Sequence, residues 1–181
     1  MTRITRRRFL SAAGLTMVGS FLAPRLCLPE KQEAKKLFMY NIHTGEYLKL
    51  VYAEGGKIVS DALAEVNTFF RDRLTNEQIA MDPALLNLIH TIHQETKPYQ
   101  PMTLVSGYRC PSTNAYLRTK SKGVAKKSYH TQGMAADIFM SGVDLSKLKK
   151  LACSKGAGGV GYYPKSGFIH VDVRPGQKKR W

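Results

Sequence analysis

Hydrophobic and polar residues recur at regular spacings along most of the chain, and these patterns predict a mixture of strands and helices. Strands are expected where apolar residues alternate with polar ones, or form short runs bounded by turn residues. The predicted strands are Leu37–Tyr40, Tyr47–Ala53, Met102–Ser106, Ala135–Phe139, Gly159–Tyr163 and Phe168–Val173. Because hairpin-like pairs stand at both ends of this series, we expect an α+β fold with a mainly antiparallel sheet and flanking helices.

Apolar residues at helical spacing predict four helices among these strands. The first covers residues 61–73, and Ser60 is its expected N-cap. The second has a clearer start, because Asp82 can cap it and Pro83 suits the first helical position. The third helix is expected near Ser112–Thr119 and is followed by a basic loop over residues 120–129. The fourth helix is expected over Leu145–Ser154.

The first 26 residues differ from the rest of the chain and resemble an export signal. Residues 1–8 contain four arginines and no acid, and residues 9–23 are almost all apolar or small. This order is typical of secretory signals, and the paired arginines Arg6 and Arg7 just before the apolar run resemble a twin-arginine signal. A short basic amphipathic helix is the alternative.

The pattern therefore predicts a twin-arginine-type export signal over 1–26, a linker over 27–36 and one folded domain over 37–181. Periplasmic localisation follows from this interpretation. Small residues are poorly placed for cleavage near Ala23, so the segment is either cut at a weak site or retained as a membrane anchor.

Charge restricts the classes of partner. The 181 residues carry 28 Lys and Arg against 13 Asp and Glu, a formal net charge of +15, and five of the arginines precede residue 27. The remaining excess favours nucleic acid, an anionic membrane surface or a carboxylate-rich cell wall. An exported protein seldom meets nucleic acid, and no reading helix or aromatic platform is recognisable, so we expect the wall and no nucleic acid. No apolar run reaches the roughly 18–20 residues of a spanning helix, which excludes a polytopic membrane protein.

Histidines and cysteines are few, and most lack neighbours that would indicate a site. His90 and His93 lie three residues apart on a predicted helix, a spacing at which two histidines can share a metal. No carboxylate accompanies them, so a solvated or capping role is favoured. His43 lies in a predicted turn and has the same interpretation. Cys110 and Cys153 could form a disulfide in an oxidising compartment or stay free.

Two segments with histidines and aspartates form the strongest candidate for a site. His130 and Asp137 lie seven residues apart across Gly133, where the backbone can turn sharply enough for both side chains to meet. His170 and Asp172 alternate along a predicted strand, so both point to one face. Two histidines and one aspartate would give a catalytic zinc three ligands and leave its fourth position to water. The spacing alone also fits a polar loop and a half-exposed strand.

These segments resemble the motifs of a known family. Ser128-x-His130-x-x-Gly133-x-Ala135-x-Asp137 is similar to the SxHxxGxAxD zinc motif of the D-alanyl-D-alanine metallopeptidases, which are related in fold to the Hedgehog signalling domain. Further agreement with an exported murein endopeptidase branch of this family lies in Asn41–Glu46, Ser106–Arg109, Gly123–His130, Gly158–Pro164 and Phe168–Asp172. The resemblance covers roughly residues 37–181 and implies a Hedgehog/DD-peptidase-like fold.

The resemblance also implies roles for particular residues. The zinc ligands would be His130, Asp137 and His170, and Arg109 would hold a substrate carboxylate or the developing oxyanion. A surface salt bridge is the alternative for Arg109. Many relatives have His-x-His at the last motif, whereas Asp172 stands there in this chain. We expect Asp172 to be the general base; the alternatives are that it is the ligand, assisted by His170, or that it only orients His170.

The function implied by the resemblance is zinc-dependent hydrolysis of peptide cross-links in peptidoglycan. The bond would join two meso-diaminopimelate residues, or D-alanine to meso-diaminopimelate. A D,D-carboxypeptidase or dipeptidase on the same scaffold is one alternative, and a wall-binding module with a structural zinc is the other. The lysines before the zinc motif are either a solubilising run or a surface that attracts carboxylate-rich stem peptides: Lys120, Lys122, Lys126 and Lys127.

Overall fold

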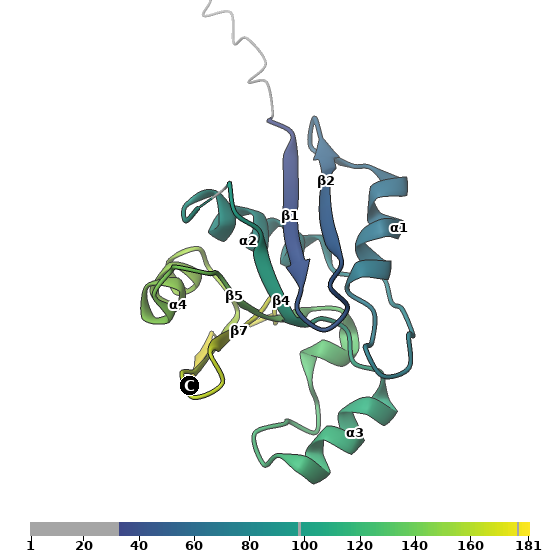
Figure 1. Ribbon diagram of the computed structural model, residues 1–181, viewed down its shortest axis with the longest axis vertical. Helices are drawn as coiled ribbons and strands as arrows, with labels where there is room; N and C mark the ends of the chain where they lie inside the picture. The colour runs from purple at the N-terminus through teal and green to yellow at the C-terminus, as the bar shows by residue number, and fades with distance from the viewer. Residues whose placement is uncertain (1–32, 98, 177) are drawn as a thin grey trace, which may run out of the picture. The chain divides into compact units, whose positions relative to one another are not determined.

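One eight-stranded sheet organises the computed structural model, which describes residues 33–97, 99–176 and 178–181 (Figure 1). The predicted export signal and most of the predicted linker lie outside these residues. The strands are β1 (Lys35–Asn41), β2 (Tyr47–Glu54), β3 (Lys57–Ile58), β4 (Met102–Ser106), β5 (Ala135–Phe139), β6 (Gly159–Tyr163), β7 (Phe168–Asp172) and β8 (Lys179–Arg180). The helices are α1 (Ser60–Phe69), α2 (Pro83–Gln94), α3 (Pro111–Lys120), the 3-10 helix η1 (Tyr129–Gln132) and α4 (Leu145–Ser154).

The sheet is mixed, with the strand order β3-β2-β1-β4-β5-β7-β6-β8. Two neighbouring pairs, β1 with β4 and β6 with β8, are parallel, and the others are antiparallel. The predicted α+β class is confirmed, and five of the seven neighbouring pairs are antiparallel, but the two parallel pairs make the sheet mixed. The chain passes through α1 and α2 before β4 returns beside β1, and such a long crossover allows the parallel pairing that a short hairpin cannot make.

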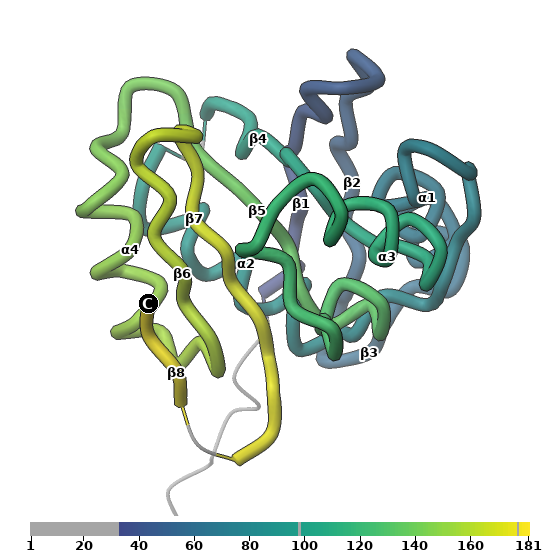
Figure 2. Tube along the Cα trace, turned by 90° about the horizontal axis from the view of Figure 1, so that it is seen from below, coloured from purple at the N-terminus to yellow at the C-terminus, as the bar shows by residue number. Residues whose placement is uncertain are grey.

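The helices pack against the sheet at different places. Helix α2 contacts β1 and α4, helix α4 contacts β6 and β7, and helix α1 contacts β2 near the other end of the sheet (Figure 2). Strand β7 contributes Ile169 and Val171 to the core, while His170 and Asp172 between and after them point to the opposite face. The alternation that builds the core therefore also places polar side chains on the other face. None of the helices in the described part of the chain is both long and apolar enough to cross a membrane.

Local signals placed most elements within a few residues of their observed bounds. Asp82 caps α2 as predicted, since its side chain accepts a hydrogen bond of 2.8 Å from the backbone N–H of Ala84. The prediction that Ser60 is the N-cap of α1 is wrong, because Ser60 is the first residue of the helix and Val59 is at the N-cap. The helix ends at Phe69 rather than at residue 73. The strands β3 and β8 were not predicted, because two residues are too few to show a period.

Both cysteines of the folded region are free thiols. Cys110 is buried at the N-cap of α3, where its sulfur accepts a hydrogen bond of 3.5 Å from the backbone N–H of Thr113. Cys153 lies half-buried on α4. Of the two possibilities that the sequence left open, the structure has the free thiols.

Candidate metal centre

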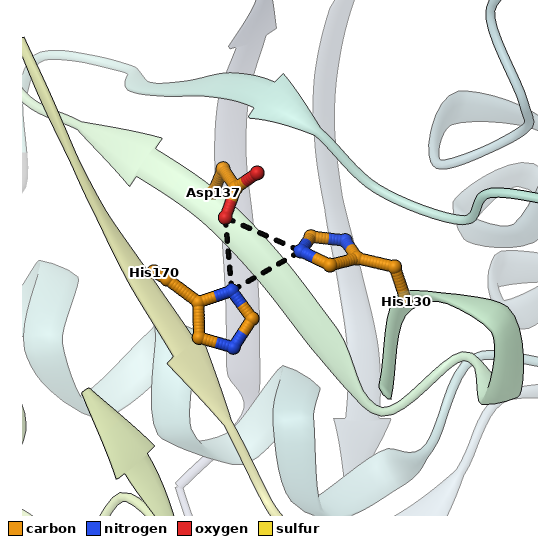
Figure 3. Close-up of side chains that lie close together, drawn as sticks. All are labelled: His130, Asp137 and His170. Atoms are coloured by element: carbon orange, nitrogen blue, oxygen red, sulfur yellow. Dashed lines mark hydrogen bonds and ion pairs between the residues drawn. The ribbon is translucent and has the colours of Figure 1, made fainter. Parts of the chain in front are cut away.

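Three side chains from separate parts of the chain converge at one point (Figure 3). His130 lies in η1, Asp137 on β5 and His170 on β7. Asp137 pairs with His170 in the antiparallel ladder of β5 and β7, which is how two residues distant in sequence meet. One potential ligand atom from each residue lies within 4.8 Å of the other two. The structure thus brings together the three ligands predicted from the sequence.

The short helix η1 holds His130 over the sheet. The Ser128 hydroxyl accepts a hydrogen bond of 3.4 Å from the backbone N–H of His130 and so caps the helix. Gly133 ends it with a φ of 69°, in the left-handed region that favours glycine. A Cβ atom at Gly133 would also lie 2.6 Å from the carbonyl oxygen of Ala80. The Ser128 cap and Gly133 therefore define the two ends of the short helix that carries His130.

The hydrogen bonds of His130 and His170 on the side away from the cluster indicate which ring nitrogen carries the proton and which faces the cluster. The Nδ1 atom of His130 lies 2.7 Å from the carbonyl oxygen of Gly107. A carbonyl oxygen can only accept, so Nδ1 carries the proton of the neutral ring and Nε2 carries none. The Nε2 atom of His170 lies 3.1 Å from Oδ2 of Asp172, and the same argument leaves its Nδ1 without a proton.

When both rings are neutral, three atoms with free lone pairs face one another at the centre of the cluster. Oδ1 of Asp137 lies 3.2 Å from Nε2 of His130 and 2.9 Å from Nδ1 of His170, and the two nitrogens are 3.1 Å apart. Buried lone pairs at such distances repel one another unless a cation or a proton lies between them. Ligands at about 2.0–2.1 Å from a tetrahedral zinc ion are about 3.3 Å apart, close to these separations. The residues therefore fit a zinc ion.

The charges around the cluster favour the deprotonated forms of two of its members. Burial raises the pKa of the Asp137 carboxyl, but His130, His170 and Arg109 outweigh burial and hold that pKa well below its usual range. Burial lowers the pKa of His130 below the ordinary histidine value. His170 differs: burial lowers its pKa, but hydrogen bonds to Asp137 and Asp172 raise it more, so the net shift is upward. In the metal-free protein, the proton on His170 is the one that competes with a metal.

Asp172 lies behind His170, on the side of the imidazole ring that faces away from the cluster. Its side chain is fully buried, and Nε of Arg174 donates to its two oxygens at 2.9 and 3.0 Å. Burial raises the pKa of Asp172, but the hydrogen bonds from Arg174 and His170 lower it further than burial raises it. The carboxylate is thus ionised and occupied by protein donors, which favours an orienting role over the expected role of general base.

Arg109 contacts the Asp137 oxygen that does not face the two histidines. Its Nη2 atom forms an ion pair with Oδ2 of Asp137, and its Nε donates to the Ser106 hydroxyl at 2.8 Å. The Arg109 side chain is 14% exposed and faces a cleft. The structure therefore places this arginine beside a candidate ligand rather than in a separate surface salt bridge.

A cleft of about 530 Å³ opens over the cluster. His130, Asp137 and His170 contribute to its lining. Of the four lysines singled out in the sequence, Lys127 lines the cleft, and it is joined there by Lys179. Aromatic side chains supply much of the remaining wall: Tyr129, Tyr163, Phe168 and Trp181. The candidate centre is therefore accessible to a substrate with both apolar and anionic parts.

Comparison with known proteins agrees with this geometry. The model of a family described as "Peptidoglycan L,D-endopeptidase MepK" matches residues 30–181. The chain belongs to this family. Proteins named "Peptidoglycan L,D-endopeptidase MepK" from Escherichia coli (strain K12) and Shigella flexneri are each 39% identical to it over 171 residues, which cover 94% of this chain and 94% of theirs. A "Probable peptidoglycan L,D-endopeptidase MepK" from Haemophilus influenzae is 37% identical over 172 residues, covering 94% and 92%. The predicted resemblance to the murein endopeptidases is thus confirmed.

Two glycines of β6 make room for the residues behind the centre of this MepK-family chain. Gly159 pairs with Asp172 and Gly161 with His170 in the sheet. A Cβ atom at Gly159 would lie 2.3 Å from Oδ2 of Asp172 and 2.6 Å from Nη2 of Arg174. The sequence prediction did not include Arg174. Its place two residues after Asp172, which continues the alternation of the strand, is the signal that could have found it.

His90 and His93, the histidines three residues apart on α2, contact backbone carbonyl groups. His93 is buried, and its Nε2 lies 2.7 Å from the carbonyl oxygen of Gln100. Nδ1 of His90 lies 2.8 Å from the carbonyl oxygen of Lys36. Both rings thus contact backbone carbonyl groups, and the solvated role expected for His93 is wrong because its side chain is buried. His43 is exposed in its predicted turn.

Proposed function

We propose that this chain is a zinc-dependent endopeptidase that hydrolyses peptide cross-links of peptidoglycan. The observation that carries the proposal is the convergence of one potential ligand atom each from His130, Asp137 and His170 in the lining of an open cleft. Membership of the MepK family supports an internal peptide bond as the target rather than the end of a chain, which a D,D-carboxypeptidase would cut.

The bond that we propose joins two meso-diaminopimelate residues. In that cross-link the acyl carbon belongs to an L-centre and the amine to a D-centre, which agrees with the words "L,D-endopeptidase" in the names of the relatives. The bond between D-alanine and meso-diaminopimelate joins two D-centres, so it is the second candidate. Lys127 and Lys179 in the lining of the cleft would attract the free carboxylates of either substrate.

In this proposal, three residues of the cluster bind the metal and Arg109 stabilises negative charge. His130 Nε2, Asp137 Oδ1 and His170 Nδ1 would hold the zinc ion. When bound, the ion acts as a Lewis acid toward the amide carbonyl and toward water. Arg109 keeps the Asp137 carboxylate in place through its second oxygen, and its permanent charge lies where it can stabilise the oxyanion or hold a substrate carboxylate.

Asp172 acts in this proposal as the residue that orients His170. By accepting a hydrogen bond from the Nε2–H group of His170, it keeps the lone pair of Nδ1 turned toward Asp137. Arg174 keeps Asp172 ionised and fixed. Service as a general base would require Asp172 to leave both of these partners, so the contacts support the orienting role.

The substrate and the predicted signal together support a periplasmic location. Peptidoglycan lies outside the cytoplasmic membrane, and the basic and apolar order of residues 1–26 favours the twin-arginine route. Replacing Arg6 and Arg7 by Lys should leave the protein inside the cell, and normal export of that variant would contradict the route. The order of the motifs supports a Hedgehog/DD-peptidase-like fold for the α+β domain.

Mass spectrometry of muropeptides tests the proposed activity. The purified protein is incubated with cross-linked peptidoglycan that contains both kinds of cross-link, with a zinc chelator and after zinc is restored, and His130→Ala serves as the matched control. We expect conversion of dimers to monomers that the chelator stops, that zinc restores and that the variant lacks. Release of free D-alanine from unchanged dimers would instead identify a carboxypeptidase. Binding of peptidoglycan without any cleavage by the folded, zinc-loaded protein would identify a wall-binding module.

A further inference from the structure

The chain has a single tryptophan, Trp181, and it lies beside the candidate metal centre. Its ring centroid is 5.4 Å from that of His170, and the two rings are inclined by 39°. The side chain lines the cleft and is 46% exposed. Nearly half of the surface of this large side chain is therefore exposed to solvent beside the candidate ligands, and the question is what the exposed indole contacts.

Several contacts fix Trp181 in this position. Its backbone N–H donates to the carbonyl oxygen of Val160 at 3.2 Å, and its carbonyl oxygen accepts from the N–H of Tyr162 at 2.8 Å. The indole Nε1–H donates to the Tyr163 hydroxyl at 2.8 Å. The guanidinium carbon of Arg174 lies 5.2 Å from the centre of the indole ring. The exposed indole is therefore held in one orientation before any ligand binds.

The strand beneath Trp181 is shaped to receive the indole. Gly161 of β6 lies under the ring, and a Cβ atom there would come within 2.6 Å of the indole Nε1 and 2.7 Å of Cε2. Gly161 also pairs with His170, so the missing side chain leaves its space on the same face as the candidate ligand. The indole thus rests on bare backbone next to the metal centre.

Trp181 extends an aromatic surface that β6 and β7 begin. Tyr163 and Phe168 stack with centroids 4.9 Å apart and planes inclined by 27°, and Tyr163 is hydrogen-bonded to Trp181. We call Tyr163, Phe168 and Trp181 the aromatic wall. All three line the cleft, which also contains the cationic side chains of Lys127 and Lys179. The cleft therefore offers a flat apolar surface together with positive charges.

We infer that the aromatic wall is the subsite for the aliphatic chain of the diamino acid that carries the scissile cross-link. This inference rests on the proposed function. A diamino dicarboxylic acid has methylene groups between two charged ends, so its middle suits an aromatic face and its carboxylates suit lysines. Trp181 is the member of the wall nearest to His170, and it determines where that chain lies relative to the reacting amide.

Fluorescence tests the wall without any catalysis. Because Trp181 is the only tryptophan, its emission reports on this surface alone. The metal-free protein is titrated with a stem tripeptide that ends in meso-diaminopimelate, and in parallel with the dipeptide L-alanyl-D-glutamate. We expect a saturable change in emission with the tripeptide and none with the dipeptide. An emission that stays constant, from protein that cleaves cross-links when loaded with zinc, would overturn the inference and leave the proposed function intact.

Kinetics with four variants separate contact with substrate from support of the fold. Trp181→Ala should raise KM at least about tenfold with a smaller change in kcat, because the wall binds the substrate before and during the reaction. Trp181→Phe, which keeps a flat ring, should recover most of the loss. Gly161→Ala should act like Trp181→Ala, since it displaces the indole without removing it. Tyr99→Ala is the matched control, because Tyr99 is 94% exposed and lines a different cavity.

Zinc affinity and thermal melting of the same variants complete the test. The inference predicts that Trp181→Ala binds zinc and melts as the parent protein does. A loss of zinc affinity that accounts for the loss of cleavage would show that Trp181 only supports His170, and would overturn the inference. Absence of cleavage by the parent protein itself would defeat the proposed function, whereas the fluorescence titration would still decide whether the wall binds the diamino acid.

Discussion

The chain has two pairs of histidines, and the fold gives them different roles. One pair contacts backbone carbonyl groups, and the other pair contributes to the candidate metal centre. His90 and His93 lie three residues apart on one helix, yet their ring nitrogens contact separate backbone carbonyl groups. His130 and His170 lie forty residues apart, and the fold brings two of their nitrogens to within 3.1 Å. The difference is Asp137, whose oxygen lies against both rings of the second pair. A shared carboxylate, rather than closeness in sequence, distinguishes the candidate metal centre.

The physical reason lies in what each environment demands. A carbonyl group behind a histidine needs one N–H donor and is then satisfied, which is the case for the buried His93. A buried carboxylate needs several donors or a cation, because an isolated buried charge is unstable. Arg109 satisfies one oxygen of Asp137, whereas the other oxygen faces two ring nitrogens and needs a cation or a proton between them.

The largest expected effect on zinc binding and cleavage is that of removing a histidine from the candidate metal centre rather than from α2. His170→Ala removes one of three ligands, so stoichiometric zinc binding should be lost and cleavage should fall by about a thousandfold or more. The double variant His90→Ala, His93→Ala should keep one zinc per chain. Metal analysis of dialysed protein and the muropeptide assay measure both. Retention of zinc by His170→Ala together with its loss from the double variant would reverse the comparison.

A second, smaller effect tests how Asp172 acts on His170. Asp172→Asn keeps the shape but weakens the acceptor, and we expect zinc affinity to fall by about 10–100-fold. Saturating zinc should then restore most of the cleavage. If the zinc-saturated variant stays about a thousandfold slower, Asp172 is the general base and its orienting role is wrong.

The raised pKa of His170 predicts a dependence of zinc binding on pH. In the metal-free protein, the protonated ring contributes stability below the unfolded value of about 6.5, and that contribution is lost as pH rises through the higher folded-state pKa. Zinc requires the same proton to leave, so its affinity should rise with pH, by up to about tenfold per unit below that pKa. Thermal melts with and without zinc should show a larger increase in Tm at pH 8 than at pH 5.5. An increase that does not depend on pH would contradict this assignment.

The smallest effect on zinc is expected at His93. His93→Ala removes a buried side chain and leaves the carbonyl oxygen of Gln100 without its donor, which should lower the free energy of unfolding by about 1–3 kcal/mol. Zinc affinity should not change. Urea unfolding and a zinc titration measure the two quantities, and His90→Ala, whose ring is more exposed, is the milder control. A fall in zinc affinity without a loss of stability would contradict the structural role of His93.

Local patterns were sufficient for much of this site. The alternation in Phe168–Val173 predicts that His170 and Asp172 share a face, and Gly133 predicts the sharp turn after His130; the structure has both features. These predictions succeed because each depends on a few neighbouring residues. The spacing alone also fitted a polar loop and a half-exposed strand, and the ligand set was what the family resemblance implied.

Features that depend on distant pairing were not predicted. The parallel pairing of β1 with β4 depends on the crossover through α1 and α2, and no periodicity within either strand records it. Arg174 and Trp181 become part of the site only when β7 and β8 lie on either side of β6. The two residues of β8 form too short a segment to show this arrangement in sequence.

The most direct test of the metal centre is an anomalous difference map from crystals of the zinc-loaded protein, recorded at the zinc absorption edge. We predict one peak per chain, coordinated by Nε2 of His130, Oδ1 of Asp137 and Nδ1 of His170. A peak bound by Asp172, or one held by His90 and His93, would contradict the account of how this fold builds its site.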